Sequence, residues 1–358
     1  MGRYSLRKLD RGNLNPIVWR HPEASIRARL LPACWQRERR LMRKFGLILL
    51  LLLFGFALTT VAQQAPQQAP DLSKVQVKVQ KLADNVYVLQ SSGAQAGMGN
   101  IGVFTGDDGI VLVDSQLVEL GPKIEAALKT VSDKPVKYVL NTHWHGDHTG
   151  GNAYFGKTAV LIAQDNVPKT MQKEPDRRIT NLPVSLPTVT FSNQLALHVN
   201  GAEIRVMYFG RAHTDGDVVV FFPGNSVVHM GDVLTNFDPP HFPAIDNDND
   251  GTGGPEGEVA AIEYVLAHAP DDAKIIPGHG VVASKAELRK YLDVVKATTA
   301  VVQAGINQGK SLDQLKQEKV LAQWDSLESP PIKEDVYLER LYKSLTAKKK
   351  SSGAGEGQ

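Results

Sequence analysis

The chain has 358 residues, enough for one large or two modest domains, and its 42% hydrophobic and 22% charged residues are those of an ordinary globular protein. Its net charge is +2, but residues 1–62 contain twelve Lys and Arg and only three Asp and Glu, which leaves 28 basic and 35 acidic residues, or −7, in the rest. A mildly acidic body argues against nucleic acid as a partner. The single cysteine, Cys34, lies in the same N-terminal region, so the remainder has no disulfide, thiolate ligand or cysteine nucleophile.

The N-terminal region predicts export. Residues 1–41 are rich in arginine and lack periodicity, and we interpret them as an upstream extension or a mis-assigned start, with Met42 as the true start. Residues 42–62 combine a short basic start, the apolar run from Leu47 to Leu58 and a small residue at the expected cleavage point, which is typical of a secretory signal peptide. The run is short for a membrane span, so only an uncleaved leader would contact a membrane. We therefore expect a periplasmic or secreted protein.

A Gln, Ala and Pro-rich linker over residues 63–74 precedes the first predicted strands. Alternation of Val75, Val77 and Val79 with polar residues has the period of a strand. Further short apolar runs predict strands at 86–89, 100–105, 109–113, 136–140 and 160–163, and a second series at 189–191, 194–199, 202–208, 218–222, 226–230 and 274–276.

Helical patterns alternate with these strands. Helices are predicted at 120–131, 152–155, 164–172, 258–267, 285–307, 311–317 and 334–345, and a surface loop at 173–187. Two strand-rich halves with interleaved helices indicate an α+β sandwich of two sheets covered by helices. We expect one main domain over residues 75–300, C-terminal helices over 301–347 that cover a sheet face or support a dimer, and a disordered tail over 348–358.

The densest chemical signal is the segment His143-Trp144-His145-Gly146-Asp147-His148. Imidazole and carboxylate groups are the ligands that zinc and neighbouring metals accept. The segment follows the predicted strand 136–140, at the end where α/β proteins usually place their chemistry. His143 and His145 can point to one side of an extended loop, whereas the adjacent Asp147 and His148 must diverge, which suits a second metal nearby.

Further ligands are expected at the ends of later strands, because one zinc needs three or four protein ligands. His213 follows the strand 202–208, Asp232 follows the strand 226–230, and His279 follows the strand 274–276. Each lies near glycine, which permits a sharp bend.

The order H-x-H-x-D-H, H-T-x-G-D, G-D and P-G-H-G, over roughly residues 75–295, resembles the metallo-β-lactamase superfamily. The resemblance implies a four-layer αββα sandwich with a dinuclear zinc site, in which iron or manganese are alternative metals. His143, His145 and His213 would hold one zinc, and Asp147, His148 and His279 the other. Asp232 would bridge the two metals, together with a hydroxide.

Asp232 also bears on the branch of the superfamily. One lactamase subclass has Cys at this position, and lactamases with an H-x-H-x-D-H cluster lack the bridging Asp. The full ligand set looks more like the glyoxalase II, lactonase and ribonuclease Z branches, although the segment around His213 also resembles lactamases. The leading hypothesis is an exported hydrolase of small molecules in which hydroxide attacks an ester, thioester, lactone or amide carbonyl. The alternatives are a β-lactamase and a non-hydrolytic metal-binding or iron-dependent sulfur-oxidation protein; the oligomeric state stays open.

Supporting roles follow from the same hypothesis. Asp147 is the predicted catalytic residue, which would orient the hydroxide and shuttle a proton to the leaving group. Asp114 and Asp217 are the predicted partners that fix the histidine rings, and Trp144 is expected to pack behind the site. The segments 92–100 and 236–254 are expected to contact substrate, with Asn236, Phe237, His241 and Phe242 as candidate lining residues or members of an ordinary loop. Residues 246–251 imitate the start of an EF-hand loop, but Gly257 stands where the bidentate Glu belongs, so a solvated acidic loop is favoured over calcium.

Overall fold

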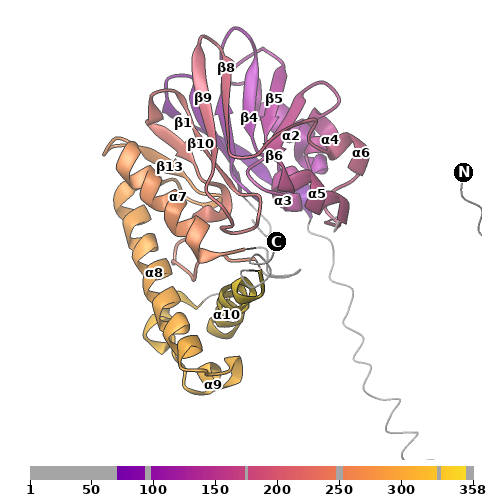
Figure 1. Cartoon of the computed structure of the whole chain (residues 1–358). Coiled ribbons are helices and arrows are strands. Elements are labelled where there is room, and N and C mark those ends of the chain that lie inside the picture. Colours follow the sequence, from indigo (N-terminus) through magenta and orange to yellow (C-terminus); the bar gives the residue numbers. More distant parts are fainter. Residues whose placement is uncertain (1–70, 93–97, 174–175, 247–252, 329–331, 352–358) are drawn as a thin grey trace, which may run out of the picture. The chain divides into compact units, whose positions relative to one another are not determined.

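Two β-sheets pack face to face, with helices on both outer sides, in the computed structural model (Figure 1). The structure describes residues 71–92, 98–173, 176–246, 253–328 and 332–351. The predicted αββα sandwich is therefore confirmed. Among the described residues, no helix combines the length and the apolar character needed to cross a membrane.

The first sheet contains seven strands in sequence order, antiparallel from β1 to β4 and parallel from β4 to β7. The strands are β1 (Gln76–Ala83), β2 (Val86–Ser92), β3 (Ile101–Phe104), β4 (Ile110–Val113), β5 (Val136–Leu140), β6 (Val160–Gln164) and β7 (Val189–Phe191). Two 3₁₀ turns, η1 (Leu72–Lys74) and η2 (Val118–Leu120), and the helices α2 (Gly121–Leu128), α3 (Gly146–Thr149), α4 (Asn152–Phe155), α5 (Asn166–Lys173) and α6 (Leu182–Ser185) accompany it.

The second sheet has the order β15-β13-β11-β10-β9-β8. Its strands are β8 (Gln194–Val199), β9 (Ala202–Tyr208), β10 (Val218–Phe221), β11 (Val227–His229), β13 (Lys274–Ile276) and β15 (Ala283–Ser284), while β12 (Thr235–Asn236) and β14 (His279–Gly280) form a separate parallel pair. The turns η3 (Pro223–Asn225) and η4 (Gly231–Val233) and the helices α7 (Pro255–His268) and α8 (Lys285–Asn307) belong to this half. β9, β11 and β13 run in one direction, so their C-terminal ends reach one edge of the sheet.

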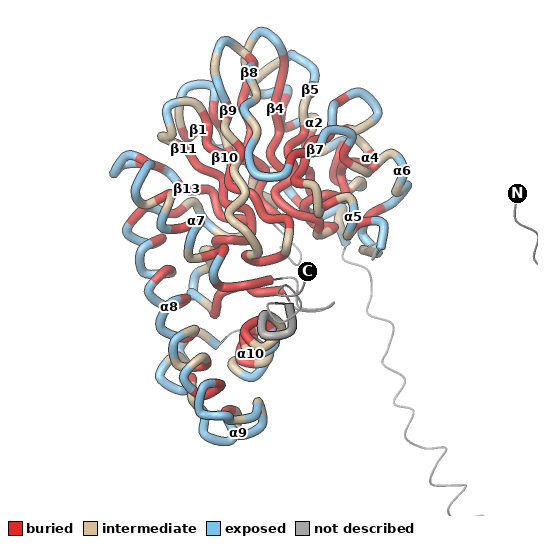
Figure 2. The backbone as a smooth tube through the Cα atoms, in the orientation of Figure 1, coloured by how far each residue is buried: buried red, intermediate tan, exposed pale blue. Residues whose placement is uncertain are grey.

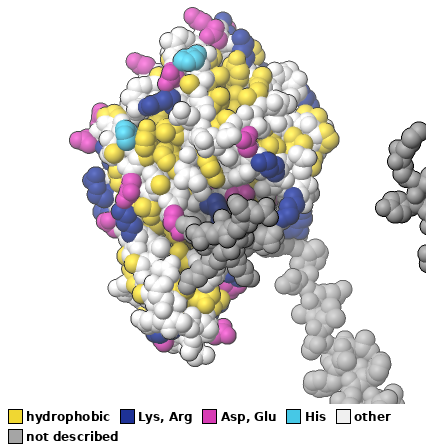
Figure 3. Space-filling view, in the orientation of Figure 1, with side chains coloured by type: hydrophobic (Ala, Val, Ile, Leu, Met, Phe, Trp, Pro, Cys, Tyr) yellow, Lys and Arg dark blue, Asp and Glu magenta, His cyan; other side chains and the backbone are white. Residues whose placement is uncertain are grey.

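The sandwich is held by apolar side chains that strand alternation sends inward. The central strands are accordingly buried along much of their length (Figure 2). Ile204 and Val206 of β9, for example, are buried against Val111 and Val113 of β4 within one cluster that spans both sheets. The outer face of the first sheet packs on α2, and that of the second sheet packs on α7 and α8. On the surface in view, acidic and basic side chains lie interspersed (Figure 3).

The C-terminal helices do not pack on a sheet face, which was one of the two predicted arrangements; support of a dimer stays a prediction. The helices α9 (Leu312–Gln317) and α10 (Glu334–Ser351) and the turn η5 (Ala322–Leu327) share an apolar cluster with Phe242, Ala244 and Ile245, and not with a sheet face. The ring of Tyr337 stacks on that of Phe242 with centroids 4.9 Å apart. These helices therefore support the segment 242–246, which reaches the site described below.

Several boundaries also differ from the sequence predictions. The helix predicted at 120–131 ends at Leu128, and the predicted loop 173–187 includes α6. The expected domain boundary at residue 300 falls inside α8. This helix begins at the predicted residue, after the capping box formed by Ser284 and Glu287. Helix α10 continues to Ser351, into the predicted tail, and residues 352–358 lie outside the described part of the chain, as do residues 1–70 with the predicted leader.

Candidate metal centre

All seven predicted ligands meet at one edge of the sandwich. His143, His145, Asp147 and His148 follow β5, which runs parallel to its neighbours in the first sheet. The other three follow strands of the second sheet that run in one direction, β9 for His213, β11 for Asp232 and β13 for His279. The carboxyl ends of these strands therefore bring residues that are far apart in sequence into one site.

The first group contains His143, His145, His213 and Asp232. Nδ1 of His145 lies 3.0 Å from Nε2 of His143 and 3.0 Å from Nε2 of His213. Ligand nitrogens around a tetrahedral zinc at about 2.0–2.1 Å would be roughly 3.3 Å apart, so this nitrogen triangle has the size of a zinc site.

The second group contains Asp147, His148 and His279. Nε2 of His279 lies 3.2 Å from Nε2 of His148 and 3.1 Å from Oδ2 of Asp147. These three donor atoms likewise converge on one point.

Asp232 lies between the two groups. Its Oδ2 is 3.4 Å from Nε2 of His213, and its Oδ1 is 3.3 Å from Nε2 of His148. Oδ1 is buried and accepts no hydrogen bond, which is costly for a carboxylate unless a cation takes that place. A side chain at Gly278 would collide with this carboxylate, because an added Cβ would lie 1.8 Å from Oδ1. The donor set and the orphaned oxygen both fit a pair of metal ions.

Hydrogen bonds on the far side of the rings fix their orientation. The predicted partner Asp114 accepts hydrogen bonds from Nδ1 of His148 and from the backbone N–H and hydroxyl of Thr142, each at 2.8 Å. Asp114 is buried and has a positive φ of 69°, a strained backbone conformation that is common at functional sites.

Two further hydrogen-bond partners of the histidine rings lie in the segment 242–246. The carbonyl oxygen of Ala244 lies 2.6 Å from Nδ1 of His213, and a carboxylate oxygen of Asp246 lies 2.7 Å from Nε2 of His145. These contacts turn Nε2 of His213 and Nδ1 of His145 toward the cluster. Asp246 was predicted to open an acidic loop, and its carboxylate instead reaches a metal ligand; residues 247–252 lie outside the described part of the chain.

Asp217 does not act on a histidine ring as predicted. Its carboxylate accepts hydrogen bonds from the backbone N–H and hydroxyl of Thr214 and so shapes the turn after His213. Burial raises the pKa of Asp217 to about 6.

Arg178 is a site residue that the sequence did not suggest. Its Nη1 lies 2.7 Å from Oδ1 of Asp147, and its Nη2 lies 2.6 Å from Oδ2 of Asp176. Asp176 in turn accepts a hydrogen bond from the backbone N–H of Gly146. This segment, predicted to be a surface loop, therefore binds the ligand segment at two points.

The carboxylates make the cluster attractive to cations. Burial alone would lower the pKa of His279, but Asp232 and Asp147 outweigh it and raise that pKa to about 9. For Asp147, burial raises the pKa, and His148, His279 and Arg178 outweigh this effect and lower it well below its usual range. Burial lowers the pKa of His143 and keeps its ring neutral, the form that binds metal.

Of the other residues predicted near the site, some lie where expected and others do not. Trp144 packs on Ala163, Val167 and Met171 behind the site, as predicted. Phe242 was a candidate lining residue, but this is wrong, because its ring is fully buried against Tyr337. Residues 93–97 of the predicted loop 92–100 lie outside the described residues, whereas Gly99 approaches so closely that an added Cβ would be 2.5 Å from the ring of His148.

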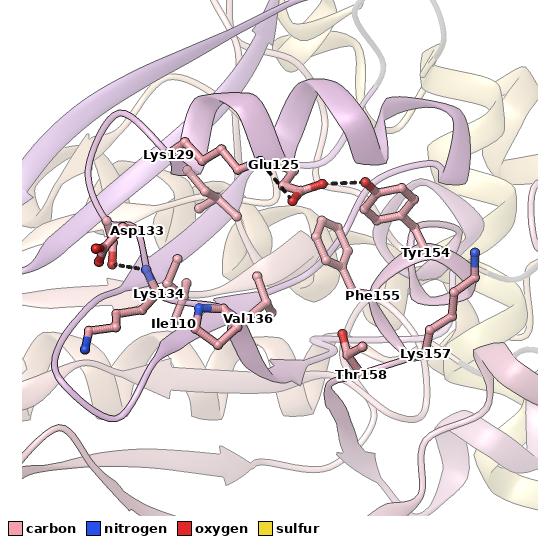
Figure 4. Close-up of a pocket in the computed structure, with 13 residues that line it drawn as sticks. Ile110, Glu125, Lys129, Asp133, Lys134, Val136, Tyr154, Phe155, Lys157 and Thr158 are labelled. Carbon is pink, nitrogen blue, oxygen red and sulfur yellow. Dashed lines mark hydrogen bonds and ion pairs between the residues drawn. The ribbon is translucent and has the colours of Figure 1, made fainter.

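The described residues line several cavities, which include the following two. One, of about 540 Å³, lies at the opposite ends of the parallel strands, beside Ile110 and Val136, where Tyr154 donates a hydrogen bond to Glu125 (Figure 4). The other, of about 430 Å³, is lined by Asn236, Phe237 and His241 and so includes three of the four predicted lining residues. Only the second adjoins the metal cluster, through Phe237, whose ring stacks on that of His279 at 6.1 Å.

This fold and these ligands define a metal-dependent hydrolase with two adjacent metal positions. Residues 94–294 match the model of the metallo-beta-lactamase superfamily, and the chain belongs to that family. It is 24% identical over 242 residues to the metallo-beta-lactamase type 2 of Bacteroides fragilis, an alignment that covers 65% of this chain and 89% of that protein. It is 28% identical over 215 residues to the metallo-beta-lactamase type 2 of Elizabethkingia meningoseptica, covering 54% and 73%. A metallo-beta-lactamase from Pontibacter korlensis has the same fold, with a TM-score of 0.50, 21% identity and coverage of 62% of this chain and 99% of that one.

Proposed function

We propose that this protein is an exported dinuclear zinc hydrolase that cleaves an ester, thioester, lactone or amide bond of a small molecule. The observation that carries the proposal is the placement of Asp232 between two convergent groups of nitrogen and oxygen donors. Such donors without thiolate suit zinc, and they also accept iron or manganese. Export to the periplasm or medium rests on the sequence pattern of residues 42–62.

When bound, a metal pair supplies hydroxide at neutral pH and polarises the carbonyl oxygen of the substrate. The chain's own residues orient the reaction. Oδ2 of Asp147 faces the cluster while Arg178 holds Oδ1, so this carboxylate is fixed and ionised. We assign to Asp147 the orientation of the attacking oxygen and the transfer of its proton to the leaving group.

The test is a substrate screen of the purified, metal-analysed protein with lactones, thioesters, esters and amides, each with and without chelator. Turnover that chelator abolishes and zinc restores is the expected result. His143→Ala removes a ligand and should lower turnover by more than the roughly 10–100-fold that loss of an outer hydrogen-bond partner causes. His198→Ala, which removes a histidine whose side chain is 74% exposed, is the control and should keep wild-type activity. Full activity of the His143 variant would contradict the dinuclear assignment.

A β-lactamase is the second candidate, because two curated relatives carry that name. Nitrocefin in the same chelator-controlled assay tests it, and no turnover of nitrocefin beside turnover of esters would remove it. Metal analysis covers the remaining alternative, since iron in place of zinc together with no hydrolysis would favour sulfur oxidation on the same scaffold.

A further inference from the structure

The 430 Å³ cavity, which we call the side pocket, is built on the strands that carry the second metal position. Thr235 of β12 pairs with His279 of β14, and Asn236 pairs with Gly280. Two hydrogen bonds also join Asn236 and Val281: the backbone N–H of Val281 donates to the carbonyl oxygen of Asn236 at 2.8 Å, and Nδ2 of Asn236 donates to the carbonyl oxygen of Val281 at 3.0 Å. The pocket wall therefore begins within three residues of Asp232 and two of His279.

The inner wall of the side pocket is apolar and aromatic. The ring of Phe237 stacks on that of His279, with centroids 6.1 Å apart, and also packs on that of His241 at 4.4 Å. Val294 of α8 and Leu327 of η5 complete the wall. Val281 at its rim is 54% exposed, one of few large apolar side chains on the described surface with no covering partner.

Three charged residues, Asp238, Glu287 and Lys290, also line the side pocket. The carboxylate of Glu287 is engaged by the backbone N–H and hydroxyl of Ser284, both at 2.7 Å, in the cap of α8. The volume lies in the range that holds small organic ligands. The apolar side chains of the inner wall suit an apolar chain beside a metal-bound carbonyl.

We propose that the side pocket receives the apolar acyl chain of the substrate while the carbonyl of that chain lies at the metal pair. This inference rests on the proposed function, which it narrows to acyl compounds with a medium-length apolar chain. The residues that set the specificity are then Phe237, Val281, Val294 and Leu327.

Two homologous series test the proposal on the zinc-loaded protein. The first measures kcat/KM for p-nitrophenyl esters from acetate to decanoate. The second measures Kd by calorimetry for alkyl hydroxamates from acetohydroxamate to octanohydroxamate, which bind metal without being hydrolysed. In the wild type, kcat/KM should rise and Kd should fall by up to about fourfold per methylene until the pocket is full.

Val294→Trp fills the side pocket and should flatten both series. Val336→Trp is the control, because Val336 is a helical valine like Val294 but lies exposed on α10, away from the pocket, and both slopes should remain. Should Val294→Trp fail to fold, Val281→Asn changes only the exposed rim and should reduce the slopes.

The outcomes separate the two proposals. A hydroxamate series without chain-length dependence in the wild type overturns the side-pocket assignment, whether or not esters are cleaved. Slopes that Val294→Trp leaves intact overturn it as well. A graded hydroxamate series that Val294→Trp flattens, together with no chelator-sensitive hydrolysis of any ester, thioester, lactone or amide, supports the pocket and overturns the proposed hydrolase.

Discussion

The two carboxylate oxygens of Asp147 have different surroundings, and this difference defines the role of Arg178. Oδ2 lies among His148 and His279, whereas Oδ1 lies 2.7 Å from the guanidinium of Arg178. A carboxylate held at one oxygen presents the other in a fixed direction, which pre-organises a metal ligand. Arg178 is thus a positioning residue for the second metal position.

Arg178→Ala should weaken zinc binding at the second position by about 10–100-fold, because Asp147 loses its outer partner. Competition with a chromophoric chelator at neutral pH measures this loss. Arg177→Ala, an exposed neighbour, is the control; equal zinc affinity in the two variants would refute the positioning role.

At the scale of elements, the C-terminal helices are part of the metal centre although they contribute no ligand. Tyr337 stacks on Phe242, and Nη1 of Arg340 donates to the carbonyl oxygen of Ile245 at 3.3 Å. Ala244 and Asp246 on the same segment orient His213 and His145. Helix α10 therefore supports the first metal position indirectly, through the loop residues Ala244, Ile245 and Asp246.

Tyr337→Ala should lower the free energy of unfolding by about 3–5 kcal/mol, since it leaves a large cavity under Phe242. It should also weaken the first metal position, because Ala244 and Asp246 lose their support. Urea unfolding and zinc titration measure the two effects. Tyr342→Ala, on the same helix and bonded to Lys310, should destabilise less and leave zinc affinity unchanged. Unaltered zinc affinity in the Tyr337 variant would show that the helix supports only the fold.

The sequence predicted those elements whose residue pattern can be recognised within a short stretch of the chain. The strands carry uninterrupted or alternating apolar residues, and each predicted ligand follows such a strand beside a glycine, so their meeting at one edge followed from strand direction. Asp246 and Arg178 have no such signal. Their positions depend on the path of loops that distant segments hold in place, α10 for Asp246 and Asp147 itself for Arg178. The same packing hides Phe242, which in sequence looked like any aromatic residue of a polar loop.

At the scale of the whole molecule, one buried acid links stability to pH. Glu258 of α7 is fully buried against α8, where Oε1 accepts a hydrogen bond from Tyr291 at 3.0 Å and Oε2 has no hydrogen-bond partner. Burial raises the pKa of Glu258 from 4.5 to about 8, although the bond from Tyr291 opposes the shift. The folded protein therefore keeps a proton that the unfolded chain releases near pH 4.5.

Glu258 should consequently lower the free energy of unfolding as pH rises from about 4.5 to 8, because its folded state binds one proton more across that window. Glu258→Gln should remove this contribution to the slope. We expect little difference from wild type at pH 5 and a gain on the order of a few kcal/mol at pH 8, measured by urea unfolding in excess chelator so that metal binding does not contribute. Glu263→Gln on the exposed side of α7 is the control. A variant that keeps the wild-type slope would show that Glu258 is ionised in the fold.

Each metal position takes ligands from both halves of the sandwich. The first takes His143 and His145 from the first half and His213 and Asp232 from the second, and the other takes Asp147 and His148 from the first half and His279 from the second. A duplicated or transferred gene fragment that encoded one half would thus carry no complete site for either ion.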